Sequence, residues 1–200
     1  MDSETLEPPY PDWLSATLAS DATDGRGVLP PWIRALHPGS RVFGPAFVVL
    51  ACEDDNQAVR VALDGPLPAG CVLVVGGQST SRTATVGGLM ALEFQQAGVA
   101  GLVTDGLVRD SQEMRALGWP VWARGTTPTA SGKRDPGTVG GAVTLGGALI
   151  RQGDLVVADD DGVVIWPQAA AAALLARAAA RRDADNVRLA RLLAAANRTG

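Results

Sequence analysis

An arginine and an aspartate stand next to each other just after an apolar segment of the chain. Arg109 and Asp110 follow the run at residues 99–104 (VAGLVT) and a turn that begins with Asp105. The planar guanidinium of arginine can bind a carboxylate through two hydrogen bonds. An aspartate oxygen is a ligand that Mg²⁺ prefers, and Mg²⁺ keeps water in its remaining positions. The pair predicts a small pocket for an anion and a metal; a surface ion pair or a helix N-cap at Asp110 is the alternative.

Two adjacent glycines lie upstream, inside a segment with helical spacing. Gly87 and Gly88 are followed by Leu89 and Met90. Free N–H groups at the start of a helix bind carboxylate or phosphate oxygens, and glycine lets a ligand approach the backbone closely. These residues are therefore candidates for backbone contacts to an anion. The alternative is a tight packing contact.

Three further groups of residues have a chemical and a plain structural interpretation. The acidic run at residues 159–161 could hold a metal, but its position before a glycine favours a turn between strands. Lys133 and Arg134 lie in a long polar loop at residues 126–136, either as a lid over an anionic ligand or as a solvated loop. Trp119 and Trp122 favour core or interface positions.

The possible metal ligands are mainly oxygen atoms. The sequence contains one histidine, His37, and two cysteines, Cys52 and Cys71. This set is too small for a zinc site built from His and Cys. A metal would therefore be Mg²⁺ or Mn²⁺. Because both cysteines stand in apolar segments, we expect two buried free thiols.

Composition indicates one globular domain. The 200 residues are 46% hydrophobic and 19% charged, which argues against disorder. The net charge is -4 and basic residues form no stripe with interleaved aromatics, so we expect no nucleic-acid partner. Apolar stretches are too short to span a membrane, and the acidic, proline-rich start does not resemble a signal peptide. We therefore expect a cytoplasmic protein that does not bind membranes.

The apolar pattern predicts an α/β fold in which helices cover a sheet. Strands are predicted at residues 41–52, 71–75, 99–104 and 120–124, and helices at 13–22, 56–63, 84–97 and 111–117. Two β-rich segments follow at 139–149 and 154–166, and then a long helix at 168–196. Residues 1–12 are expected to form a loose tail, and residues 13–200 a single domain that includes the long helix.

Five segments, taken in order, resemble the RraA-like family. The strongest likeness lies in residues 99–110 (VAGLVTDGLVRD) and 153–167 (GDLVVADDDGVVIWP). It continues in residues 120–128 (PVWARGTTP), 16–30 (ATLASDATDGRGVLP) and 41–49 (RVFGPAFVV), and it spans about residues 13–190. This family includes 4-hydroxy-4-methyl-2-oxoglutarate aldolases, oxaloacetate decarboxylases and non-enzymatic regulators of RNase E.

The resemblance implies a layered β/β/α fold of the swivelling-domain kind, assembled as a homotrimer or a pair of trimers with the site between subunits. It implies that Arg109 binds the carboxylate or keto oxygen of a small oxo-acid and that Asp110 holds Mg²⁺ or Mn²⁺, partly through water. It also implies that Asp105 lines the same pocket. The backbone contacts to the substrate would come from residues 87–90, that is Gly87, Gly88, Leu89 and Met90.

Some positions depart from the family pattern. Many aldolases of the family carry an acid in the place of Gly88, although others carry glycine there. Loss of that carboxylate removes a possible organiser of metal-bound water. The aldolases also take an acid from the C-terminal segment of a neighbouring subunit, for which Asp183 and Asp185 are the candidates. The regulators lack the aspartate that follows the arginine, so Asp110 favours an enzyme.

The resemblance thus implies a class II, metal-dependent aldolase or decarboxylase. Its reaction would be retro-aldol cleavage of a 4-hydroxy-2-oxo-diacid, decarboxylation of oxaloacetate, or both, and each gives pyruvate. Two alternatives stay open. One is a non-catalytic regulator or scaffold that binds another protein. The other is a specialised biosynthetic lyase or hydrolase acting on another oxo-acid, with a pocket reshaped by the 126–136 loop, Trp119 and Trp122.

Overall fold

The computed structural model describes residues 11–197, so most of the predicted tail at residues 1–12 lies outside the described part. Four parallel strands form the centre of the main sheet. In spatial order they are β7 (Val121–Ala123), β5 (Gly101–Thr104), β3 (Val72–Gly76) and β2 (Val42–Leu50). Every residue of β3 is buried, as its wholly apolar sequence predicted for a strand covered on both faces.

Antiparallel strands extend this sheet at both ends. The short β1 (Arg34–Ala35) pairs with β7, and β12 (Leu155–Asp159) pairs with β2. Strand β13 (Gly162–Trp166) then pairs with β12, and β9 (Thr138–Val139) pairs with the end of β2. Asp159 faces Gly162 in the register, so the acidic run at residues 159–161 forms a turn between strands, as expected.

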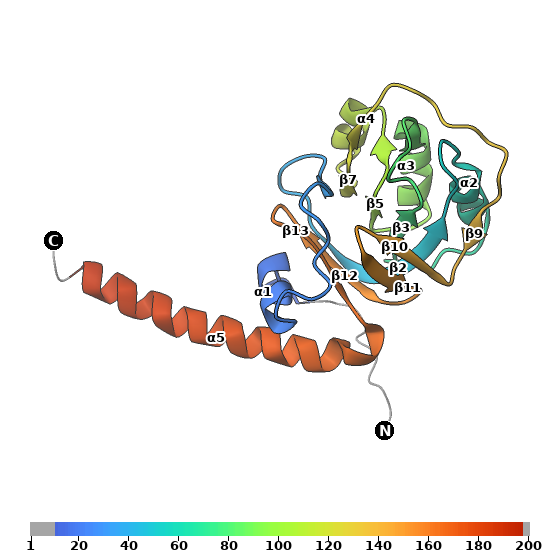
Figure 1. Cartoon of the computed structure of the whole chain (residues 1–200). Helices are drawn as coiled ribbons and strands as arrows, with labels where there is room; N and C mark the ends of the chain where they lie inside the picture. The colour runs from blue at the N-terminus through green and yellow to red at the C-terminus, as the bar shows by residue number, and fades with distance from the viewer. Residues whose placement is uncertain (1–10, 198–200) are drawn as a thin grey trace.

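Three helices cover one face of the sheet. They are α2 (Gln57–Asp64), α3 (Gly88–Gln96) and α4 (Ser111–Leu117), and they lie together over β5 and β3 (Figure 1). Their apolar side chains share one core cluster with the strands, in which Phe94 stacks on Trp119. Helix α4 has the predicted bounds, whereas α2 is shifted from the predicted 56–63 by one residue.

The helix predicted at residues 84–97 is wrong in its first turn. Residues Ala84–Val86 form strand β4, and α3 begins only at Gly88. Strand β4 is fully buried and pairs in parallel with β6 (Leu107–Val108), which pairs with β8 (Gly125–Thr126). This tertiary pairing overrides the helical spacing of the local sequence. The resulting three-stranded sheet brings the residues after β4 and β6 together.

The C-terminal half of the domain covers the other face. A hairpin of β10 (Ala142–Leu145) and β11 (Ala148–Arg151) packs there in a second core cluster. This hairpin lies so close to the end of β3 that the last residue of the strand, Gly76, has no room for a side chain. A Cβ atom at Gly76 would lie 2.1 Å from Cγ2 of Val143.

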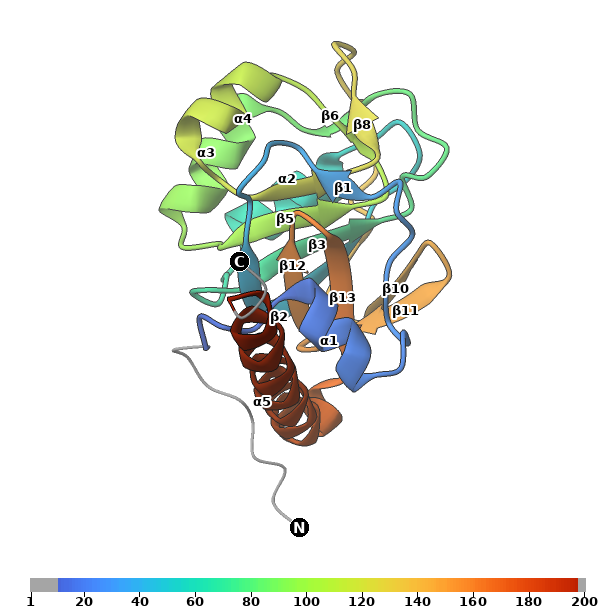
Figure 2. The same ribbon diagram turned by 90° about the vertical axis from the view of Figure 1, so that its left-hand side faces the viewer.

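Two helices pack on β12 and β13. Helix α1 (Ala16–Ala22) is capped by the Ser15 side chain, which accepts the N–H of Leu18. A 3-10 turn, η1 (Gln168–Ala170), leads into α5 (Ala171–Ala196). The first half of α5 packs beside α1, and its second half extends away from the body (Figures 1 and 2). No helix within residues 11–197 combines the length and apolarity needed to cross a membrane.

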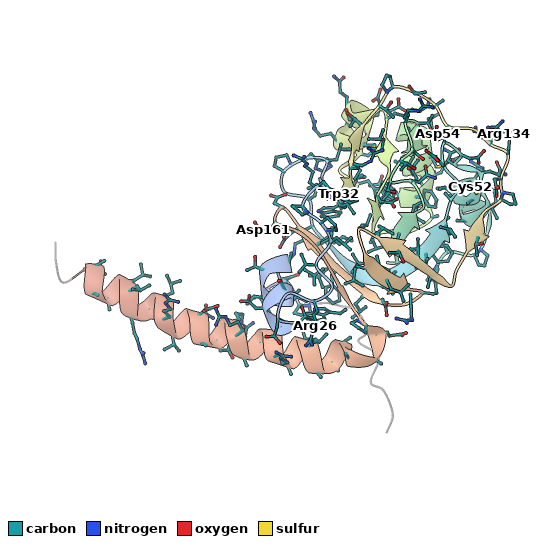
Figure 3. The ribbon with its side chains drawn as sticks, in the orientation of Figure 1. Arg26, Trp32, Cys52, Asp54, Arg134 and Asp161 are labelled. Carbon is teal, nitrogen blue, oxygen red and sulfur yellow. The ribbon has the colours of Figure 1, made fainter. Side chains whose placement is uncertain are left out.

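The predicted α/β domain with a long C-terminal helix is confirmed, but the prediction for the cysteines is half wrong. Cys71 is a buried free thiol, whereas Cys52 is exposed (Figure 3). The reason is that β2 ends at Leu50, so Cys52 lies in the turn after the strand and not in its apolar run. Trp119 and Trp122 are both buried in the core, where neither lines the site described below. They therefore do not reshape it directly.

Candidate active site

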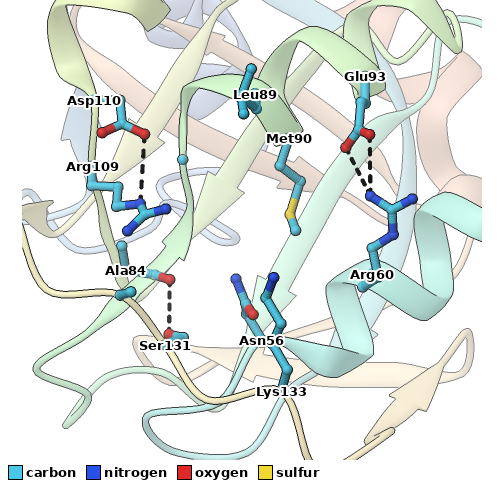
Figure 4. Close-up of a pocket in the computed structure, with 12 residues that line it drawn as sticks. Asn56, Arg60, Ala84, Leu89, Met90, Glu93, Arg109, Asp110, Ser131 and Lys133 are labelled. Atoms are coloured by element: carbon cyan, nitrogen blue, oxygen red, sulfur yellow. Dashed lines mark hydrogen bonds and ion pairs between the residues drawn. The ribbon is translucent and has the colours of Figure 1, made fainter.

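A cavity of about 280 Å³ lies between the start of α3, the side of α2 and the 127–137 loop (Figure 4). Arg109 and Asp110 stand at one side of it, and Lys133 rises from the loop at another. Leu89 and Met90 contribute the first turn of α3. The complete lining is Asn56, Arg60, Ala84, Gly87, Leu89, Met90, Glu93, Arg109, Asp110, Ala130, Ser131 and Lys133.

Asp110 has a backbone conformation that L-residues seldom adopt. Its φ is +58°, in the left-handed region, directly before α4. Strain of this kind is concentrated at functional sites. The carboxylate makes no hydrogen bond to the N–H groups at the start of α4. The side chain of Asp110 therefore does not cap that helix, and the N-cap interpretation is wrong. Instead, Oδ2 of Asp110 accepts the N–H of Gly88, at 3.0 Å, and so caps the start of α3.

Arg109 is held by its backbone and by its neighbour. Its N–H donates to the carbonyl oxygen of Val86 at 3.1 Å, which extends the pairing of β6 with β4. Its Nε lies 3.5 Å from Oδ2 of Asp110. The side chains are 40% and 41% exposed, so the pair borders the cavity and stays open to solvent. An arginine with one edge engaged still offers donors to an anion.

The two glycines have different roles. Gly87 lines the cavity, and a Cβ atom there would lie 2.8 Å from Oδ2 of Asp110 and 2.9 Å from Nε of Arg109. Gly88 differs from its expected role, because its N–H is already donated to Asp110 and the residue does not line the cavity. The first turn of a helix leaves N–H groups without partners inside the helix. Leu89 and Met90 supply that turn at the cavity wall.

Asp105 does not line the cavity as the resemblance implied. Its side chain is buried, with the residue 3% exposed, and its Oδ1 accepts the N–H of Gln78 at 3.0 Å. Burial raises the pKa of this carboxyl, while backbone hydrogen bonds such as that from Gln78 oppose the rise. Asp105 therefore lies outside the cavity lining, where it holds the loop that follows β3.

The loop at residues 127–137 is largely exposed, as the solvated-loop interpretation predicted, but it is fastened to the body of the domain and so is not a free lid. Ser131 donates to the carbonyl oxygen of Ala84 at 2.8 Å, and Gly132 exchanges backbone hydrogen bonds with Asp54 and Asn56. Beyond Lys133, the buried carboxylate of Asp55 accepts the N–H of Arg134 at 2.9 Å. The loop is thus fastened on both sides of Lys133.

Arg60, Glu93 and Asn56 are polar residues of the cavity that were not singled out from the sequence, and Ser131 is a fourth. Arg60 on α2 forms an ion pair with Glu93 on α3, at 2.9 Å, and another with Asp64, at 3.0 Å. Asn56 is 8% exposed and donates from Nδ2 to the carbonyl oxygen of Thr85, while its Oδ1 has no partner among residues 11–197. The only sequence signal for Asn56 is its position after a strand end, where α/β folds place ligands.

Asp110 offers one carboxylate oxygen as a possible ligand for a divalent cation. Its Oδ2 is engaged by Gly88 and Arg109, and no interaction of Oδ1 is seen within the described part of the chain. Residues 11–197 contain no cluster of three or more His, Cys, Asp or Glu side chains suited to a metal. Mg²⁺ is commonly bound by one or two carboxylates, with water and substrate in its other positions. Asp110 would hold such an ion with Oδ1.

The C-terminal acids lie on α5, outside this cavity. Asp183 pairs with Arg182 at 2.9 Å and Asp185 with Arg181 at 3.2 Å. Both acids are at the surface of the chain, so they do not contribute to the cavity of their own subunit.

Known proteins resemble the chain over most of its length. A protein of Halalkalibacterium halodurans named "Putative 4-hydroxy-4-methyl-2-oxoglutarate aldolase" is 35% identical over 175 residues, covering 88% of this chain and 83% of its own. Streptomyces coelicolor RraAS2, described as an unusual member of the RNase ES inhibitor RraA protein family, superposes with a TM-score of 0.80 at 32% identity, covering 89% of this chain and 93% of its own. The RNA-processing inhibitor RraA from Thermus thermophilis has a TM-score of 0.70 at 31% identity, covering 77% and 93%.

A family model agrees with these relatives. The model described as Aldolase/RraA, of the RraA-like group, matches residues 16–165. This range contains the strands and helices that build the cavity, together with Arg109 and Asp110. The chain therefore belongs to the RraA-like family.

Proposed function

We propose that this protein is a divalent-metal-dependent carbon–carbon lyase that releases pyruvate from a small oxo-acid. The substrate would be a 4-hydroxy-2-oxo-diacid cleaved by a retro-aldol step, oxaloacetate losing carbon dioxide, or both. The observation that carries the proposal is the Arg109–Asp110 pair fixed at the cavity beside the first turn of α3. The names of the aldolase relatives support the same reaction type.

Both reactions leave negative charge on the keto oxygen of the pyruvate fragment. The guanidinium of Arg109 would bind the carboxylate or keto oxygen and stabilise the charge that develops there. N–H groups in the first turn of α3, at Leu89 and Met90, would orient the carboxylate. When bound at Asp110, Mg²⁺ or Mn²⁺ would supply Lewis acidity toward the keto oxygen.

Proton transfer requires a base beside the substrate hydroxyl. In the retro-aldol step, a water held near that hydroxyl by Asp110 would take its proton, since Oδ2 of Asp110 is fixed by Gly88 and Arg109 while Oδ1 faces no partner in the described chain. Asp105 is separated from the cavity by its burial, so it would act by positioning the loop and not as the base.

The proposal includes self-assembly. We expect a homotrimer or a pair of trimers in which Asp183 or Asp185 of α5 enters a neighbour's site. The outer half of α5 supports this expectation, because Leu189, Leu192 and Leu193 are all more than half exposed there. Analytical ultracentrifugation of the full chain measures the assembly.

The test of the lyase is pyruvate formation from oxaloacetate and from 4-hydroxy-4-methyl-2-oxoglutarate. We expect turnover with Mg²⁺ or Mn²⁺, its loss with EDTA, and its recovery when metal is restored. Oxaloacetate also decarboxylates without protein, so a metal-matched blank without enzyme is the reference. Release that is equal with and without EDTA would contradict the metal role. No release from either acid would favour the regulator, an alternative supported by the inhibitor names of the structural relatives.

A further inference from the structure

Lys133 is the only lysine in the sequence. The chain has 17 basic residues counted as Lys plus Arg, and the other 16 are arginine. This single lysine lines the cavity, and in Figure 4 it points upward from the loop beside Asn56. A lysine presents a compact ammonium charge with three donors, whereas arginine presents a larger planar fork.

The charges around the cavity leave Lys133 uncompensated. Arg109 is paired with Asp110, and Arg60 is paired with Glu93 and Asp64. Within residues 11–197, no ion pair or hydrogen bond engages the ammonium of Lys133. Among the charged side chains that line the cavity of one chain, Lys133 is therefore the cation without a paired carboxylate, and such a cation attracts an anionic group.

The position of Lys133 is built by the fold. The loop is fastened before it by Ser131 and Gly132, and after it by Arg134, whose N–H binds the carboxylate of Asp55. Arg134, the next residue along the chain, is a cation that does not share this position. The Arg134 side chain is 87% exposed, does not line the cavity and lies near the periphery of the molecule (Figure 3).

We propose that Lys133 binds a second carboxylate of the substrate, across the cavity from the oxo-acid end held by Arg109, and so selects dicarboxylic over monocarboxylic 2-oxo-acids. This inference rests on the proposed function for the orientation of the substrate. Lys133 then determines specificity because its ammonium attracts the charge of the second carboxylate. It forms no covalent bond to the substrate.

The experiment compares two acids that a retro-aldolase cannot cleave. 2-Oxoglutarate and 2-oxopentanoate have the same chain length, and only the first has a distal carboxylate. Calorimetry with Mg²⁺ present should show that the natural protein binds 2-oxoglutarate at least about fivefold more tightly. Lys133→Met should reduce this preference to about one. Lys133→Arg should keep part of it, and Arg134→Met should keep all of it.

A second readout uses the single lysine directly. Reductive methylation with ¹³C-formaldehyde labels Lys133 and the α-amino group, and comparison with Lys133→Met identifies the lysine resonance. 2-Oxoglutarate should shift this resonance at concentrations where 2-oxopentanoate does not. Raised salt should weaken the preference, because the interaction is between charges open to solvent.

Several results would overturn the assignment. They are an unchanged preference in Lys133→Met, equal binding of both acids by the natural protein, or binding of neither. If borohydride trapped pyruvate on Lys133, a covalent role for this lysine would replace the proposed role in binding a carboxylate. Because binding is measured without turnover, failure of the lyase assay would defeat the proposed function and leave a measured dicarboxylate preference intact.

Discussion

The N–H of Gly88 donates to Oδ2 of Asp110 at 3.0 Å, which joins the first turn of α3 to the loop that precedes α4. These residues are 22 positions apart in the sequence. The hydrogen bond fixes one carboxylate oxygen and leaves Oδ1 for a ligand. A negative charge at the start of a helix is also favourable for the helix.

Replacement of Asp110 by Asn separates the structural role of this side chain from the role of its negative charge. The amide oxygen can still accept the N–H of Gly88, but it is a weaker metal ligand than a carboxylate. We expect kcat/KM to fall by about 100-fold or more, with little change in Tm. The measurements are metal-dependent pyruvate release and calorimetric binding of Mn²⁺. Glu113→Gln, in the first turn of α4 outside the cavity, is the matched control, and full activity in Asp110→Asn would contradict the assignment.

Gly87→Ala tests the closeness of the Arg109–Asp110 pair to the backbone. The added Cβ would lie within 3 Å of both side chains, at 2.8 Å from Oδ2 of Asp110 and 2.9 Å from Nε of Arg109. Both must move, so we expect at least about a tenfold loss in kcat/KM, since small displacements of catalytic groups are costly. Gly65→Ala is the control, because its Cβ would meet only ordinary contacts at 3.5 Å. Equal activity of the two variants would show that the pair tolerates displacement.

The sequence predicted best the parts of the site that depend on neighbouring residues. Arg109 and Asp110 are adjacent, and the helix after them forms at residues 111–117 as expected. Strand β3 could be recognised because five apolar residues bounded by glycines leave few alternatives. Each of these features follows from local composition and spacing.

The parts that depend on distant contacts could not be predicted. Ala84–Val86 forms a strand because it pairs with β6, which no local pattern indicates. The burial of Asp105 depends on the loop at Gln78, and the ion pair of Arg60 with Glu93 joins two helices. Tertiary pairing decides these positions, and local propensity is only a weak guide to it.

Asp55→Ala should loosen the 127–137 loop. The buried carboxylate of Asp55 accepts the N–H groups of Gln57, Arg134 and Asp135. Their loss should lower the free energy of unfolding by about 2–4 kcal/mol, because buried donors are left unsatisfied. Urea denaturation measures the loss, and limited proteolysis should show faster cleavage within residues 127–137. Asp64→Ala, at an exposed ion pair, should change stability by less than about 1 kcal/mol; a similar loss in both variants would contradict the fastening role.

The two cysteines should react with a thiol reagent at very different rates. Cys52 is exposed, whereas burial raises the pKa of Cys71 to about 11 and its side chain is inaccessible. We expect one thiol per folded chain to react with Ellman's reagent, and the second only after unfolding. A hydrogen bond to Asp135 raises the pKa of Cys52, so Asp135→Asn should speed the first reaction at neutral pH. Two fast thiols, or none, in the folded protein would contradict this.

Asp105 should give the folded protein a measurable pH dependence. Burial raises the pKa of its carboxyl in the folded state, whereas an unfolded aspartate titrates near about pH 3.9. Between these two pKa values the folded chain keeps a proton that the unfolded chain has lost. Stability from this group is therefore full below about pH 3.9 and falls as pH rises through the folded pKa, by about 1.4 kcal/mol for each unit of difference.

Asp105→Asn removes this titration while it keeps an oxygen that can accept the N–H of Gln78. The variant loses other hydrogen bonds to the carboxylate, so its absolute stability is not the diagnostic quantity. The diagnostic quantity is the difference in unfolding free energy, variant minus natural protein, from urea titrations between about pH 3.5 and pH 8. We expect this difference to increase with pH above about pH 3.9 and then level off. A difference that stayed constant, or decreased with pH, would mean that burial does not raise the pKa of Asp105 in the folded protein.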